Sequence, residues 1–174
     1  MAKLKVAVTA NDHAQGPADA PVTVVEYGDY ECPHCGHAYP IVKQLQKNFG
    51  NKLRFIFRNF PLREAHPHAE EAAETAEFAA SQGKFWEMHD LIFENQRALG
   101  DRVFVQLAQK LKLDVQALAK SLNGGEFADR VQEDFSGGVR SGVNGTPTFF
   151  INGQRHDADF ELETLMEAVN EALG

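Results

Sequence analysis

The chain has 174 residues, of which 43% are apolar and 24% are charged, and its formal net charge is -8. This length and composition fit one compact domain with a sizeable core, so we expect a single domain over residues 1–174. The acidic balance, without any basic cluster, argues against phosphate-backbone binding, and no apolar stretch approaches the length of a membrane-spanning helix. We therefore expect no nucleic-acid partner and no membrane insertion.

The first residues, Met1-Ala-Lys-Leu-Lys-Val-Ala-Val, lack the long apolar stretch and small-residue cleavage site of a secretory signal. If Met1 is the native start, the sequence predicts a cytoplasmic protein. If an export signal has been removed, it predicts a periplasmic or other extracytoplasmic one. The polar stretch from Asn11 to Pro21 is predicted to be a loop.

The next segment predicts a strand, a helix and a second strand. Residues 22–27 form a β-branched, mostly apolar run typical of a buried central strand. Apolar residues then recur at helical spacing, at Ala38, Val42, Leu45 and Phe49. Gly50 is expected to end this helix, and residues 53–57 alternate like a strand. The three elements should form a βαβ unit with parallel strands and a right-handed crossover.

An inserted block of four or five short helices is predicted between about residues 61 and 138. Asp101 and Asp114 stand where N-caps belong, each ahead of a helical apolar pattern. Several acidic residues of the block are expected on a solvated helix face, namely Glu70, Glu71, Glu74 and Glu77.

Strands return near the C-terminus. Residues 148–152 are predicted to be a strand that ends in the hairpin-turn dipeptide Asn152-Gly153, with a short partner strand after it. A final helix is expected to begin after an N-cap at Asp159. The order predicts an α/β domain in which helices cover a small mixed sheet.

The only two cysteines form the motif Cys32-Pro33-His34-Cys35. A disulfide that closes so short a loop stabilises little, so we interpret the pair as chemical rather than structural. Cys32 should lie at a helix N-terminus, where unpaired N–H groups and the helix dipole favour the reactive thiolate. Pro33 suits the first helical position, and His34 can donate a hydrogen bond to the anion. Cys35 is then placed to resolve a mixed disulfide.

Three carboxyl groups near this motif complicate the prediction. Asp29 and Glu31 precede Cys32 and would raise its pKa if their charges were held near the sulfur, so the motif alone does not give the reduction potential. Glu26 lies among apolar strand residues. It is either a buried proton acceptor that serves Cys35 or a residue on the exposed face of an edge strand.

Residues 19–36 resemble the active-site segment of DsbA-type thiol–disulfide oxidoreductases, and residues 142–153 resemble the second motif of that family. Together with the element order, the resemblance covers nearly the whole chain from about residue 12. It implies a thioredoxin-like fold, an α/β class with a small mixed β-sheet flanked by helices and an inserted all-helical block. It also implies a cis peptide bond between Thr146 and Pro147 beside the cysteines, with both residues contacting an extended substrate. Pro40 matches a helix-kinking proline of thioredoxin folds, and Glu26 matches their buried acid.

The predicted function is disulfide exchange with protein substrates through a mixed disulfide on Cys32, without a bound cofactor or metal. Partners would be protein thiols or disulfides and an unidentified redox partner, and we expect a monomer. Whether the protein acts as an oxidase, a reductase or an isomerase is left open.

Two alternatives use the same residues differently. Cys32, His34, Cys35 and His37 include metal-ligand types, but the chain has no second CxxC motif to complete a structural zinc site. His66 and His68 are expected on a loop surface. The other alternative is a chaperone-like binding module on the same fold, against which the second cysteine argues.

Overall fold

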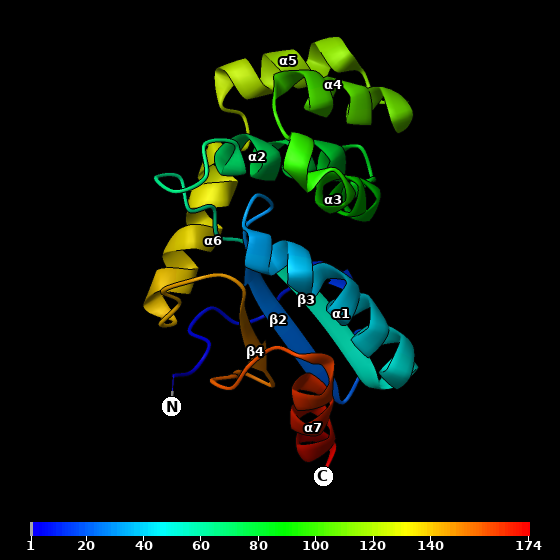
Figure 1. Ribbon diagram of the computed structural model, residues 1–174, viewed down its shortest axis with the longest axis vertical. Coiled ribbons are helices and arrows are strands. Elements are labelled where there is room, and N and C mark those ends of the chain that lie inside the picture. The colour runs from blue at the N-terminus through cyan, green and yellow to red at the C-terminus, as the bar shows by residue number, and fades with distance from the viewer. Residues whose placement is uncertain (1) are drawn as a thin grey trace.

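The computed structural model describes residues 2–174 (Figure 1). The strands are β1 (His13–Gln15), β2 (Val22–Gly28), β3 (Leu53–Asn59), β4 (Thr148–Ile151) and β5 (Gln154–Arg155). The helices are α1 (Pro33–Phe49), α2 (Ala69–Ser81), α3 (Phe85–Glu94), α4 (Asp101–Lys110), α5 (Val115–Gly124), α6 (Ala128–Arg140) and α7 (Leu162–Leu173), with 3-10 turns η1 (Gly50–Lys52) and η2 (Gln96–Ala98). None of the helices in this range combines the length and apolar composition needed to cross a bilayer.

The strands form one mixed sheet in the order β1-β3-β2-β4-β5. β2 and β3 are parallel, as predicted, and β4 runs antiparallel to β2 on its other side. The loop predicted for residues 11–21 is wrong at β1, which pairs antiparallel with β3. β1 has only three residues, so it carries no recognisable alternation of its own.

The two faces of the sheet are covered by different parts of the chain (Figure 1). Val22 and Val24 of β2 pack in a core with α1 and α7, for example with Leu45 and Leu165. Val25 and Tyr27 belong to a second core on the opposite face, which also contains residues of the N-terminal segment and of α6. Because side chains alternate along a strand, Glu26 lies on the α1 face.

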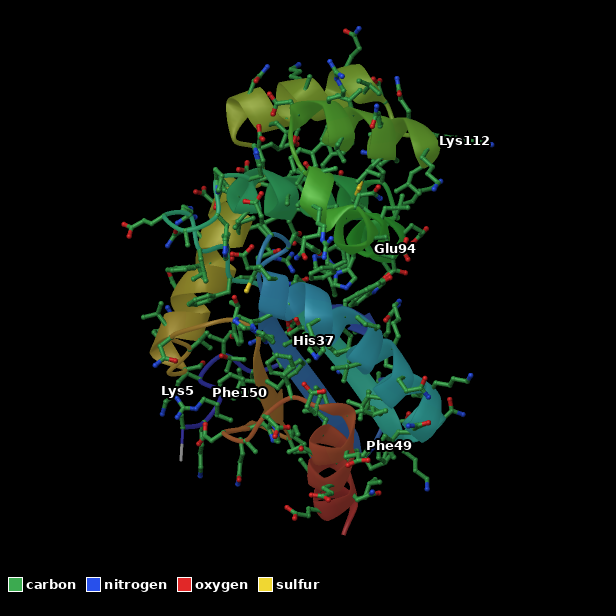
Figure 2. The ribbon with its side chains drawn as sticks, viewed as in Figure 1. Lys5, His37, Phe49, Glu94, Lys112 and Phe150 are labelled. Carbon is green, nitrogen blue, oxygen red and sulfur yellow. The ribbon has the colours of Figure 1, made fainter. Side chains whose placement is uncertain are left out.

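The helical block lies beyond the sheet, over the start of α1 (Figure 1). Polar contacts join α1 to α3: Tyr39 donates to the Glu94 carboxylate at 3.3 Å, and the Lys43 ammonium lies 2.9 Å from Asp90. Figure 2 shows Glu94 on the side of α3 that faces α1. The predicted insertion is confirmed, with helices running from residue 69 to residue 140.

The predicted helix caps are partly confirmed. The Asp114 carboxylate accepts hydrogen bonds from the N–H groups of residues 116 and 117, at 2.9 and 3.1 Å. The cap predicted at Asp101 is wrong, because Gly100 is the N-cap and Asp101 is the first residue of α4. Asp159 also precedes the actual cap, Glu161, whose N–H donates to it at 3.1 Å.

The solvated glutamate face predicted for α2 is wrong at Glu74 and Glu77, which are both buried. The unpredicted strand β1 explains Glu77: His13 of β1 lies 2.9 Å from both carboxylate oxygens. The Asn59 side chain donates to the same carboxylate at 2.8 Å. A buried carboxylate with these partners is compensated for the water that it loses.

The turn predicted at Asn152-Gly153 is confirmed. Asn152 has a φ of 46° and Gly153 a φ of 83°, the left-handed pair that a tight hairpin turn requires. The turn reverses the chain between β4 and β5, which pair antiparallel on the side of β4 away from β2.

Candidate active site

Cys32 is the N-cap residue of α1, with an extended conformation (φ -71°, ψ 124°). Its carbonyl accepts the first helical hydrogen bond, from the N–H of Gly36 at 3.0 Å, and Pro33 is the first residue of the helix. The Cys32 side chain therefore extends over the end of α1, where the backbone N–H groups have no helical partners.

The surroundings of Cys32 lower the pKa of its thiol to about 5. The largest cause is a hydrogen bond from the Cys35 thiol, which outweighs the effect of burial. The Thr146 side chain and the backbone N–H groups of Cys35 and His34 stabilise the anion further. The two backbone N–H groups are the donors that a helix N-terminus offers to an anion.

Cys35, one turn into α1, is in the opposite situation. It is 0% exposed, and its sulfur accepts a hydrogen bond from the N–H of Asp29 at 3.4 Å. Burial raises the pKa of the Cys35 thiol well above its usual value, and the neighbouring Cys32 and Glu26 add to the effect. Both cysteines are free thiols, so the structure represents the reduced form.

The loop before β4 brings the second motif to the first. The peptide bond between Thr146 and Pro147 is cis. The thiol of Cys32 donates to the carbonyl oxygen of Thr146 at 3.6 Å, although the two residues are 114 positions apart. The buried hydroxyl of Thr146 has no hydrogen-bond partner among residues 2–174 when Cys32 is a thiol, so it is free to donate to the thiolate.

Glu26 lies beneath the cysteines on β2. The side chain is 3% exposed, and burial, followed by the charge of Cys32, raises its pKa to about 8. A side chain at Gly28 would overlap the Glu26 carboxylate and the Phe57 ring, so glycine leaves the space that Glu26 occupies. The exposed edge-strand alternative is wrong, because β2 lies between β3 and β4 in the sheet.

The two histidines near the cysteines are exposed. The contribution of His34 to the low pKa of Cys32 comes through its backbone N–H, and a role for its imidazole stays a prediction. His37 lies 3.1 Å from Glu161 at the start of α7, and Figure 2 shows it near the beginning of α1. Among the residues that the structure describes, no three His, Cys, Asp or Glu side chains gather as metal ligands would.

The loop between β3 and α2 supplies contacts that sequence reasoning missed. The buried Asp29 accepts hydrogen bonds from the N–H of Leu62 at 2.9 Å, the N–H of Glu31 at 2.8 Å and the ring of His66 at 2.8 Å. Burial opposes protonation of His66, but the Asp29 carboxylate raises its pKa. His66 lies on a loop with its side chain 20% exposed, as expected, but its pairing with Asp29 was not predicted. The residues are 37 positions apart, and no sequence pattern links them.

Gln96, in η2 of the helical block, is the other missed residue. Its Nε2 donates to the carbonyl oxygens of Tyr30 and Cys32, both at 2.8 Å. A glutamine in a polar turn gives no signal in a sequence, because only the folded chain brings it to the cysteine loop.

Comparisons with known proteins agree with this geometry. The family described as Thioredoxin matches residues 8–171. The chain belongs to this family. A solved structure of BdbD from Bacillus subtilis, in its oxidised form, has a TM-score of 0.85 and 26% identity, covering 93% of this chain and 92% of that one. A thioredoxin-like oxidoreductase from Silicibacter pomeroyi DSS-3 has a TM-score of 0.80 and 25% identity, covering 95% of this chain and 94% of that one. The thioredoxin-like α/β fold of DsbA-type oxidoreductases is thereby confirmed.

Proteins that are similar to this chain in sequence are named as antiporters rather than as oxidoreductases. A protein of Salinispora arenicola named Na(+)/H(+) antiporter NhaA 1 is 47% identical over 93% of this chain, but over only 25% of its own length. A protein of Herminiimonas arsenicoxydans named Na(+)/H(+) antiporter NhaA is 40% identical over 88% of this chain and 24% of its own length. The chain thus spans about a quarter of the length of these relatives.

Proposed function

We propose that the protein exchanges disulfides with other proteins, with Cys32 as the attacking sulfur and Cys35 as the resolving one. The contact between the Cys32 sulfur and Thr146 carries this proposal, because it joins the cysteine motif to the cis-proline loop. Fold alone would not distinguish an exchange enzyme from a binding module.

In the reducing direction, the Cys32 thiolate attacks one sulfur of a substrate disulfide. A bond forms between the two sulfurs, the substrate S–S bond breaks, and the other substrate sulfur leaves as a thiolate. Cys35 then loses its proton and attacks the Cys32 sulfur of the mixed disulfide. The second substrate sulfur leaves, two electrons have passed to the substrate, and the Cys32–Cys35 disulfide remains. Oxidation of a substrate dithiol is the same sequence reversed.

We assign Glu26 the proton transfer that Cys35 requires. A buried thiol cannot ionise readily without an acceptor, and Glu26 is the carboxyl group whose charge raises the pKa of that thiol. With a pKa of about 8, Glu26 can hold or release a proton near neutral pH. It would accept the proton of Cys35 when the mixed disulfide is resolved, and return it in the reverse reaction.

Substrate would bind beside Pro147. A hollow of about 240 Å³ opens there, lined by Pro147, Thr148, Phe160 and residues 155–158. An extended segment that pairs with the backbone of Thr146, as an added strand does, would bring its sulfur to Cys32.

Insulin reduction by a dithiol tests the function, with the intact protein compared with Cys32→Ser and Cys35→Ser. Both variants should lose turnover. Equal rates in the intact protein and in Cys32→Ser would remove the enzyme proposal, and would leave a binding module as the explanation of the fold.

Equilibration with glutathione buffers tests the direction of electron flow. A potential near that of DsbA would support an oxidase, and one near that of thioredoxin a reductase. One structural relative is described as a periplasmic thioredoxin-like protein from Salmonella enterica serovar Typhimurium, with a TM-score of 0.75 and 20% identity over 93% of this chain and 90% of that one. An oxidising potential would favour the extracytoplasmic alternative for this chain, because glutathione keeps cytosolic thiols reduced.

The antiporter relatives favour a candidate partner. Identity of 47% over 93% of this chain indicates that the matching part of that relative shares the thioredoxin fold, so we propose a cation antiporter as one physical partner. The Cys35→Ser variant should trap mixed disulfides, which mass spectrometry would identify. If the trapped proteins included no antiporter, the proposed partner would be rejected, whereas the proposed exchange reaction would still stand.

A further inference from the structure

We propose that Gln96 is a positioning residue that holds the backbone before and after Cys32, and so orients the N–H groups around the Cys32 sulfur. The inference rests on the proposed exchange reaction only where it says why a reactive Cys32 is useful. Its physical content, the pKa of Cys32, can be measured whether or not the protein turns over a substrate.

The contacts of Gln96 are specific to the reactive loop. One Nε2 atom donates to the carbonyl oxygen of Tyr30 and to that of Cys32, each at 2.8 Å. The first carbonyl belongs to the peptide group that joins Tyr30 to Glu31, and the second to the one that joins Cys32 to Pro33. The same Cys32 carbonyl also accepts the first hydrogen bond of α1, from Gly36 at 3.0 Å. Gln96 therefore fixes the orientation of the peptide that begins the helix.

This orientation controls the sulfur. The Cys32 thiolate is stabilised partly by the backbone N–H groups of His34 and Cys35, which requires Cys32 to keep its extended N-cap conformation. Without Gln96, the Tyr30 carbonyl loses this donor and the Cys32 carbonyl keeps only the Gly36 N–H, so the loop can rotate and the negative ends of both carbonyls are less compensated beside the sulfur. Both effects raise the pKa of a neighbouring thiol.

α1 has a glycine at the position where the Gln96 side chain packs. A Cβ atom at Gly36 would overlap the side-chain oxygen of Gln96, so glycine at this position admits the carboxamide. On the other side, the Asn95 side chain donates to the carbonyl oxygen of Leu91 at 2.8 Å and so fixes the start of η2 to the end of α3. Gln96 thus connects the helical insertion to two backbone carbonyls of the reactive loop.

The test is a titration of Cys32, followed by thiolate absorbance, in Gln96→Ala and Gln96→Met. Methionine keeps the volume but has no donor, so it separates the hydrogen bonds from packing. Both variants should raise the pKa of Cys32 by about one unit, a tenfold change in its ionisation constant that corresponds to roughly 30 mV in the potential. Gln109→Ala, at an exposed glutamine of α4, is the matched control and should titrate like the intact protein.

Gly36→Ala tests the contact from the other side. It should displace the carboxamide and raise the pKa as Gln96→Ala does, and the double variant should show no further increase. A Cys32 titration in folded Gln96→Met that coincides with that of the intact protein would overturn the proposal. Failure of both Gln96 variants to fold would also overturn it, in favour of a purely structural role. If Cys32→Ser and Cys35→Ser both kept the insulin-reducing activity of the intact protein, that result would instead reject the proposed function.

Discussion

The surroundings of the two sulfurs differ far more than their separation along the chain suggests. Cys32 lies at the end of a helix, beside a loop and a turn that come from distant parts of the sequence. Cys35 lies inside the protein, against a buried carboxyl group on the central strand. One region offers hydrogen-bond donors to a negative charge, while the other excludes water from it. The difference teaches that a CxxC motif specifies a pair of thiols, whereas the surrounding fold decides which one is ionised.

Alkylation should show the largest consequence of this difference. At pH 7 the lowered pKa of Cys32 favours its thiolate, whereas the raised pKa of the buried Cys35 keeps it a thiol, and alkylation requires the anion. We expect limiting iodoacetamide to modify Cys32 at least about a hundredfold faster, as measured by peptide mass spectrometry. The urea-unfolded chain is the control, in which both cysteines should react alike. Similar rates in the folded protein would contradict the asymmetry.

The pH dependence of stability should separate the two regions next. The pKa of Glu26 is raised from 4.5 to about 8, so its burial makes the folded protein less stable as pH rises through this range. The pKa of Cys32 is lowered from 9.0 to about 5, so the reduced protein gains stability between those values. Between pH 5 and 8 the two effects oppose each other, at about 1.4 kcal/mol per pH unit each.

Two variants should reveal these opposing slopes in urea unfolding of the reduced protein. Relative to the intact protein, Glu26→Gln should gain stability with rising pH, and Cys32→Ser should lose it. Cys32→Ser also removes the smaller contribution of the Cys32 charge to the pKa of Glu26, so the comparison rests on the sign of each slope. Parallel pH profiles for all three would show that neither pKa is shifted as described.

Replacement of His34 tests whether its ring adds to the backbone donors around Cys32. His34→Ser keeps the backbone N–H and removes the imidazole. If the ring stabilises the anion, as the sequence predicts, the pKa of Cys32 should rise by about one unit. His37→Ser is the matched control, because His37 pairs with Glu161 instead. An unchanged titration would assign the stabilisation to the backbone alone.

The smallest effect is expected at Thr146. Thr146→Val removes a buried hydroxyl but keeps a similar shape, so the carbonyl contact with Cys32 should remain. One lost hydrogen bond should raise the pKa of Cys32 by about half a unit, measured by the same titration. Thr148→Val is a suitable control, because the Thr148 hydroxyl donates to the Gly145 carbonyl at 2.7 Å and not to the sulfur.

The parts of the structure that could be predicted are those that depend on local pattern. The central strands, α1, the insertion and the turn at Asn152-Gly153 follow from apolar period, capping and turn chemistry. The cis peptide bond at Pro147 came from family resemblance. By contrast, His66, Gln96 and the burial of Glu77 depend on contacts between residues far apart in the chain. A single sequence gives no local signal for such contacts, because a polar residue that is paired in the core looks like one on the surface.

The strand order has a consequence for how the reactive centre is built. β4 completes the sheet beside β2, yet it follows the whole helical block in the chain. During synthesis, both cysteines leave the ribosome more than a hundred residues before Thr146. Until β4 docks, the nascent polypeptide carries a dithiol without the Thr146–Pro147 loop that contacts Cys32 in the folded protein. Docking of β4, rather than emergence of the motif, therefore completes the surroundings of Cys32.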